Sequence, residues 1–166
     1  GWEPSRFDHA TLGFMEQDLD RWLISRLQSL NATVEAKMEI YHLHEVGPAV
    51  IAFIDELTNW YIRLNRRRFW TEEKTKDKEA AYATLYYSLL EFSKILAPIV
   101  PFITEEVYQN LTDGLLAQES VHLCSFPKSE MKWIDTELEN EIALIQSIVS
   151  MGRNLRNTNK LKTRQP

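Results

Sequence analysis

The residues from 50 to 64 constrain the fold more than any other stretch, because their apolar side chains recur with a helical period. They are, at steps of 3, 1, 3, 3, 1 and 3, Val50, Phe53, Ile54, Leu57, Trp60, Tyr61 and Leu64. This spacing places the side chains along one side of an α-helix. Only 5 of the 166 residues are glycine, which argues against a loop-rich β-fold. The sequence predicts an all-α bundle of four to five helices.

Apolar residues recur with a similar helical period elsewhere, and they predict the other helices of the bundle. The first helix is expected from Glu16 to about Glu39, and the second from Gly47-Pro48, where proline is tolerated in a first turn, to Trp70. A third helix ends near Pro98. We expect His42 and His44 to cap the corner between the first two helices or to lie on its surface.

The last third of the chain predicts two further helices joined by an extended strap. A short helix covers roughly Pro101 to Leu111, with Phe102, Ile103, Val107 and Leu111 facing inward. The strap runs from Ser120 to Pro127. Asp135 is placed to cap the last helix, with acidic residues in its first turns.

The charge distribution is uneven, and this bears on function. The net charge is −5, so any affinity for nucleic acid must be local. Residues 59–70 read NWYIRLNRRRFW, with four arginines, four aromatic residues and no acid. On a regular helix, the side opposite the apolar stripe carries Asn59, Arg63, Arg66 and Trp70.

These side chains are suited to an unpaired RNA strand. Guanidinium groups pair with phosphate, and exposed rings stack on bases. We expect Arg67 to flank the apolar stripe, and Arg68 to extend it with its stem packed and its guanidinium in water. An internal ion pair of Arg67 or Arg68 with Glu56 or another acid stays open. The arginines also suit a plainer role, as cations at the negative end of a helix dipole.

A second group of basic residues lies in the last 16 residues, which contain no acid and leave a net charge of −10 on the first 150. Its members are Arg153, Arg156, Lys160, Lys162 and Arg164. A frayed basic terminus is the alternative to an RNA-binding role.

The sequence offers little support for catalysis or metal binding. Glu39-x-x-His42 and Glu119-x-x-His122 match the spacing of carboxylate-bridged metal sites, but such sites need both motifs on helices. Neither motif meets that condition, so we predict no metal site and no catalytic residue, and His122 is interpreted as structural. The single cysteine, Cys124, fits a reducing compartment. No apolar run approaches the length of a membrane span.

Several blocks together resemble the anticodon-binding domain of isoleucyl-tRNA synthetases of class I. They are LDRWLISRL at 19–27, FIDELTNWYIRLNRRRFW at 53–70, LAPIVPFITEEVYQNL at 96–111 and SVHLCSFP at 120–127. KLKTRQP at 160–166 is similar to the start of the stretch that follows in that family. The valyl enzyme is the nearest sibling.

The resemblance implies a part of a larger enzyme that attaches isoleucine to tRNA using ATP and Mg²⁺. Residues 1–15 would be a linker from the preceding catalytic domain, 16–157 the anticodon-binding bundle, and 158–166 the start of a connection to a C-terminal region. The signatures H-I-G-H and K-M-S-K-S of the catalytic domain are absent, so no cofactor is expected within these residues. We expect the chain to be a fragment of a larger protein, truncated at both ends.

The resemblance also names partners and site residues. We expect a cytoplasmic monomer that binds the anticodon stem-loop of isoleucine tRNA, contacts the catalytic domain of its own polypeptide and has no membrane partner. The predicted RNA-binding residues are Asn59, Arg63, Arg66, Arg67, Arg68, Trp70, Arg153, Arg156, Lys160 and Lys162. The alternatives are a structural or protein-interaction bundle and the equivalent valyl domain.

Overall fold

The computed structural model describes residues 17–73, 75–112 and 118–160. The chain divides into two compact units, Gly1–Ile134 and Asp135–Pro166, and each is described by itself. The expected linker at 1–15 and the last six residues of the expected connection at 158–166 lie outside the described residues. All regular structure in the described ranges is helical, which confirms the all-α prediction.

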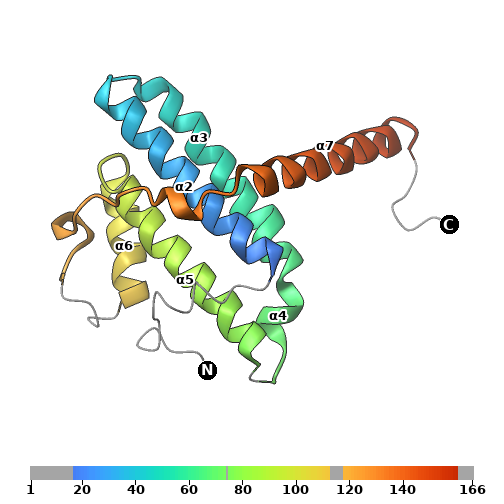
Figure 1. The fold of residues 1–166 in the computed structure, drawn as a ribbon, viewed down its shortest axis with the longest axis horizontal. Helices are drawn as coiled ribbons and strands as arrows, with labels where there is room; N and C mark the ends of the chain where they lie inside the picture. The colour runs from blue at the N-terminus through green and yellow to red at the C-terminus, as the bar shows by residue number, and fades with distance from the viewer. Residues whose placement is uncertain (1–16, 74, 113–117, 161–166) are drawn as a thin grey trace. The chain divides into compact units, whose positions relative to one another are not determined.

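The first unit is a bundle built around α5 (Lys76–Leu96). This helix contacts α2 (Asp18–Glu39) and α6 (Pro101–Thr112), and α2 also packs on α3 (Leu43–Asp55) (Figure 1). The α2 stripe holds the predicted core residues Trp22, Leu23 and Leu27, all almost fully buried. None of the described helices combines the length and apolar character needed to cross a membrane.

The corner between α2 and α3 is closed by a residue in the left-handed region. Tyr41 has φ 59°, and its N–H donates to the Met38 carbonyl, while the N–H of His42 donates to the Lys37 carbonyl at 2.8 Å. This pair of bonds is the Schellman motif, in which glycine usually takes the place of Tyr41. Helix α3 therefore starts at Leu43, before the predicted start, and includes Pro48.

The two histidines of this corner lie beside an ion-paired carboxylate. Glu45 accepts from Lys37 Nζ at 2.6 Å, and the Nδ1 atom of His42 lies 2.9 Å from its other oxygen. These two hydrogen bonds lower the pKa of Glu45. The corner assignment for His42 and His44 is thus confirmed in outline.

Helix α6 turns a different face inward from the predicted one. Phe102 is 90% exposed and Ile103 63%, whereas Thr104 and Tyr108 are buried. Tyr108 packs with Tyr86 and Val121, and its hydroxyl donates to the Gln118 carbonyl at 2.9 Å. The inward assignment of Phe102 and Ile103 is wrong because the tertiary partners of Tyr108 set the orientation of the helix.

The strap at 120–127 is anchored to α6 by one carboxylate. Oε2 of Glu105 accepts from Ser120 Oγ and from the N–H of Val121, both at 2.9 Å. The strap begins with a short 3₁₀ turn, Val121–Leu123, and is extended at Cys124. The extended prediction is therefore correct at Ser120 and Cys124 and wrong for the turn between them.

The second unit consists of α7 (Thr136–Thr158) and the residues after it. The Asp135 side chain accepts from the N–H of Leu138 at 3.1 Å, which confirms the predicted cap. Glu137 and Glu139 lie in the first turn, where the helix dipole favours negative charge.

Candidate nucleic-acid interface

The predicted second helix is not continuous. Helix α3 passes into a π-helix, η2 (Glu56–Ile62), and after a turn at Asn65 the chain forms the short helix α4 (Arg66–Trp70). A π-helix places more residues in each turn than an α-helix. The inward positions shift accordingly, to Tyr61, Asn65 and Phe69, all buried. Leu64, predicted to face inward, is 55% exposed.

The two aromatic residues assigned to the core differ in their burial. Tyr61 is fully buried, as predicted. Trp60 is only partly buried, so its assignment to the core is wrong in degree. The extra residue of the π-helical turn explains both results, because it moves the apolar phase by one position.

Helix α4 presents basic and aromatic side chains outward. Arg66 and Arg67 are exposed, and Trp70 is 73% exposed. The guanidinium carbon of Arg66 lies 4.9 Å from the ring centroid of Trp70, a cation–π arrangement that orients both side chains. Phe69 faces the opposite way, with its ring edge-on to Tyr61 and Tyr82. One side of α4 is thus held in the core and the other is open.

The remaining predicted residues of this region are also exposed. Asn59 and Arg63 both lie on the surface, and the Asn59 amide donates to Asp55 at 2.6 Å. The exposure of Asn59, Arg63, Arg66 and Trp70 agrees with the helical-face argument, although the helix itself is irregular.

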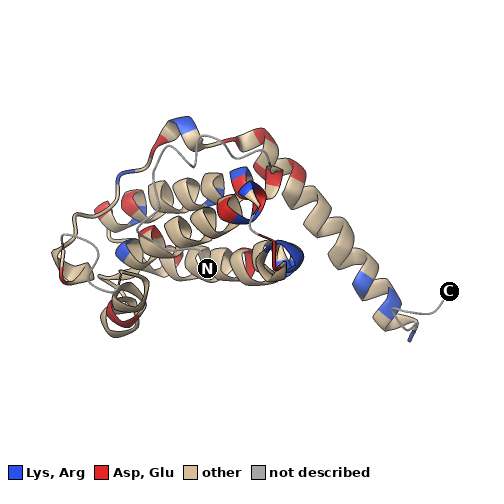
Figure 2. Cartoon of the chain, turned by 90° about the horizontal axis from the view of Figure 1, so that it is seen from below, with Lys and Arg blue, Asp and Glu red and all other residues tan. Residues whose placement is uncertain are grey.

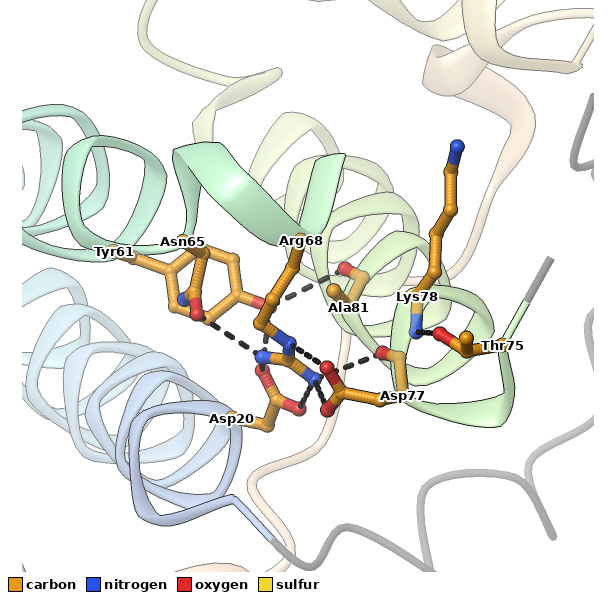
Figure 3. A network of polar contacts seen from close by, with 8 residues as sticks. All are labelled: Asp20, Tyr61, Asn65, Arg68, Thr75, Asp77, Lys78 and Ala81. Atoms are coloured by element: carbon orange, nitrogen blue, oxygen red, sulfur yellow. Dashed lines mark hydrogen bonds and ion pairs between the residues drawn. The ribbon is translucent and has the colours of Figure 1, made fainter. Parts of the chain in front are cut away.

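Arg68 points inward and does not place its guanidinium in water, which corrects the sequence-based expectation. Its two terminal nitrogens donate to the two oxygens of Asp20, each at 2.8 Å, in a bidentate pair (Figure 3). Its Nε donates to Asp77 at 3.0 Å, and Asn65 accepts a further bond at 3.1 Å. Asp20 is fully buried, and the side chain of Arg68 is 13% exposed. The partners are Asp20 and Asp77 rather than Glu56, which pairs with Arg26.

The hydroxyl of Tyr61 completes this network (Figure 3). It donates to Asp20 at 2.7 Å and lies 3.2 Å from the Ala81 carbonyl. Burial, followed by the neighbouring charge of Asp20, raises the pKa of Tyr61 well above its ordinary value. Burial alone lowers the pKa of Arg68, but the hydrogen bonds and charge of Asp20 outweigh it, so the net shift is upward. The network ties α4 to the starts of α2 and α5.

Replacing Tyr61 with phenylalanine should lower the free energy of unfolding by about 1.5–3 kcal/mol at neutral pH, because Asp20 loses a hydrogen bond to a charged acceptor. It should also flatten the alkaline loss of stability. The unfolded chain releases this proton near pH 10 while the folded chain retains it, so the contribution of Tyr61 is present below about pH 10 and is lost as the pH rises toward the folded pKa. Urea unfolding from neutral pH to about pH 11 measures both effects. An unchanged alkaline slope would contradict this assignment.

Sequence reasoning missed the residues that hold α4 in place. Asp20 lies on the apolar side of its helix, with Leu23, Ile24 and Leu27 following at steps of 3, 1 and 3. An acid at such a position needs a buried partner. The sequence therefore shows that Asp20 needs a buried partner. It does not show that the partner is Arg68, 48 residues away.

The second basic group is only partly described. Arg153 and Lys160 are exposed, whereas Arg156 is partly buried and has a partner. Lys162 and Arg164 lie outside the described residues. Figure 2 shows the acidic first turns of α7 and the basic residues toward its C-terminal end. Their role in RNA binding stays a prediction.

Neither Glu-x-x-His motif contributes to a metal centre in the described residues. Among them, no cluster of three or more His, Cys, Asp and Glu side chains is placed to hold a metal ion.

Comparison with known proteins identifies the family. A family model described as the anticodon-binding domain of tRNA ligase matches residues 20–166. The chain belongs to this family. It is 48% identical to the isoleucine–tRNA ligase of Clostridium tetani over 153 residues, which are 91% of this chain and 15% of that protein. It is 44% identical to the isoleucine–tRNA ligase of Chlamydia trachomatis over 166 residues, 100% of this chain and 16% of that protein.

A third relative gives the same picture. The isoleucine–tRNA ligase of Clostridium novyi is 46% identical over 153 residues, again 91% of this chain and 15% of that protein. The chain thus spans about one sixth of the length of these relatives. The resemblance seen in the sequence blocks is confirmed.

Proposed function

We propose that this chain binds the anticodon stem-loop of isoleucine tRNA, as the anticodon-binding domain of an isoleucine–tRNA ligase. The observation that carries the proposal is the outward face of α4, where Arg66, Arg67 and Trp70 are exposed on a helix held from behind by the Arg68 network. Guanidinium groups can pair with phosphate there, and the indole offers a stacking surface to an unpaired base.

The proposal extends to the whole enzyme. The full-length enzyme would attach isoleucine to tRNA with ATP and Mg²⁺. These cofactors would bind outside the residues of this chain. Arg63, Asn59 and the basic residues of α7 are proposed as further RNA contacts, and the enzyme is proposed to be a cytoplasmic monomer. Arg68 acts in this proposal as a positioning residue, because its donors face Asp20 and Asp77.

An equilibrium titration with labelled isoleucine tRNA tests the proposal. The matched competitor is the same transcript with its anticodon replaced, and both are titrated at two salt concentrations. We expect tighter binding of the cognate anticodon at both, with weaker binding overall at the higher salt as counterions compete for the phosphates.

The other outcomes point to different functions. Equal and weak binding of both transcripts would contradict anticodon recognition by this chain and favour a structural bundle. Preferential binding of a transcript with a valine anticodon would instead favour the valyl equivalent.

A further inference from the structure

Helix α4 is too short to keep its own direction. It has five residues, Arg66–Trp70, and the side chain of Asn65 at its N-cap makes no capping hydrogen bond. Isolated helices shorter than about 12 residues are marginal in water, so a helix of this length depends on its neighbours. Arg68 supplies such contacts on the inner side of α4. The direction of Trp70, the last residue, depends in addition on what holds the C-terminal end.

Two side chains of α5 hold the C-terminal end of α4. The hydroxyl of Tyr82 donates to the Phe69 carbonyl at 3.2 Å. The ammonium group of Lys78 donates to the Thr71 carbonyl. The last carbonyls of a helix have no partner inside it, and a nearby lysine can satisfy them. The two acceptors belong to the residues immediately before and after Trp70, so these bonds fix the backbone on both sides of it.

Lys78 is itself held in place. Its backbone N–H donates to Thr75 Oγ at 3.1 Å, in the N-terminal cap of α5. Its ammonium group lies 5.8 Å from the centroid of the Tyr82 ring, one turn further along the helix. Figure 3 shows the Lys78 side chain extending away from the pair formed by Arg68 and Asp77. Lys78 thus supports α4 at a different point from Arg68.

The indole of Trp70 takes its direction from the backbone and from Arg66. It is 73% exposed, so packing against the core does little to orient it. The guanidinium carbon of Arg66 lies 4.9 Å from the ring centroid, but Arg66 is exposed and belongs to the same short helix. If the end of α4 moves, both side chains move with it. The placement of this surface therefore depends on Lys78 and Tyr82.

We propose that Lys78 is a positioning residue for RNA binding, because its bond to the Thr71 carbonyl holds α4 in the orientation in which Trp70 can stack on a base. Tyr82 assists through the Phe69 carbonyl. The inference rests on the proposed function and adds two residues of α5 to it. Lys78 acts through α4 rather than on phosphate, since its ammonium group is engaged by Thr71 and by the Tyr82 ring. A surface held in its binding conformation loses less entropy when it binds.

Lys78→Met tests the proposal in the titration with isoleucine tRNA, because it removes the donor and keeps an unbranched side chain. Lys76→Met is the matched control, since it removes the same charge from an exposed lysine in the first turn of α5. We expect Lys78→Met to weaken binding about threefold to tenfold, as loss of one hydrogen bond does, and Lys76→Met to have little effect. Lys78→Arg keeps a cationic donor and should retain most of the affinity.

Two readouts separate positioning from direct contact with RNA. The salt slope of Lys78→Met should equal that of Lys76→Met, whereas loss of a phosphate contact would lower it by about 0.7–0.9. In a Trp70→Ala background, Lys78→Met should have no further effect, because the ring that it positions is gone. A reduced slope, or a loss of affinity that persists without Trp70, would overturn the proposal.

Tyr82→Phe gives a test that changes no charge. It removes the hydroxyl that holds the Phe69 carbonyl and keeps the ring. We expect weaker binding with an unchanged salt slope, and again no further effect in the Trp70→Ala background. An affinity equal to that of the unaltered chain would remove Tyr82 from the proposal.

A measurement without RNA keeps this inference separate from the proposed function. The N–H of Thr71 donates to the Arg67 carbonyl at 3.1 Å, so its hydrogen exchange reports on the end of α4. We expect exchange there to be about tenfold faster in Lys78→Met than in Lys76→Met. Faster exchange in a chain that binds no tRNA would contradict the proposed function and still support the hold of Lys78 on α4. Equal exchange in the two variants would overturn the role of Lys78, whatever the titration shows.

Discussion

Replacing Arg68 with alanine should lower the free energy of unfolding by about 3–5 kcal/mol, the largest effect that we expect from any single arginine of this chain. The reason is the state of Asp20 after the change. Its carboxylate is fully buried and accepts hydrogen bonds from both terminal nitrogens of Arg68. Without them, Asp20 keeps the hydroxyl of Tyr61 but loses its countercharge, and a buried carboxylate without a countercharge is costly. Urea unfolding followed by circular dichroism measures the loss.

Arg67 is the matched control for this experiment. It is the neighbouring residue of the same helix and is exposed. Arg67→Ala should change stability by no more than about 0.5 kcal/mol. Arg68→Lys should recover only part of the loss, because an ammonium group cannot reproduce the bidentate fork that faces Asp20. A loss below about 1 kcal/mol for Arg68→Ala would show that the network contributes little to folding.

Replacing Trp70 with alanine should weaken tRNA binding by about 5- to 150-fold, the range given by loss of one stacked base at about 1–3 kcal/mol. The indole is 73% exposed, so its removal leaves no cavity and the melting midpoint should stay nearly unchanged. The titration with isoleucine tRNA and a thermal melt measure the two quantities. Trp70→Phe keeps an aromatic face and should retain most of the affinity.

The arginines beside Trp70 should affect the same titration through salt dependence. Arg63→Ala and Arg66→Ala should each reduce affinity and lower the salt slope by about 0.7–0.9 for every phosphate that the variant no longer neutralises. Because Arg66 lies over the Trp70 ring, its effect should not add fully to that of Trp70→Ala. A loss of stability with unchanged affinity would assign the arginines to capping the helix end instead.

The helices that could be predicted from the sequence are those whose evidence is local. Helix α2 ends at the predicted Glu39, and α6 begins at the predicted Pro101, because apolar period and proline position act within a few residues. The cap at Asp135 is local in the same sense. Such signals need no knowledge of the tertiary partners.

The features that escaped prediction depend on distant residues. Phe102 and Tyr108 have comparable apolar surface, but only Tyr108 finds Tyr86 and Val121 as neighbours. At the candidate site, the spacing relative to the apolar stripe correctly placed Arg66 and Trp70 outside. It also placed the stem of Arg68 on the apolar stripe, but it could not show that the guanidinium is buried, because its partner Asp20 lies 48 residues earlier in the chain.

The π-helical stretch between α3 and α4 sets the direction in which the side chains of α4 point. If Glu56–Ile62 kept its length and took up α-helical spacing, everything after it would rotate by about one residue position, roughly 100° about the helix axis. Arg66 and Trp70 would then face a different direction, and Arg68 would be turned away from Asp20. A homologue with a regular α-helix here would keep this surface only if it were shorter by a single residue. Length and helix type are therefore constrained together in this stretch.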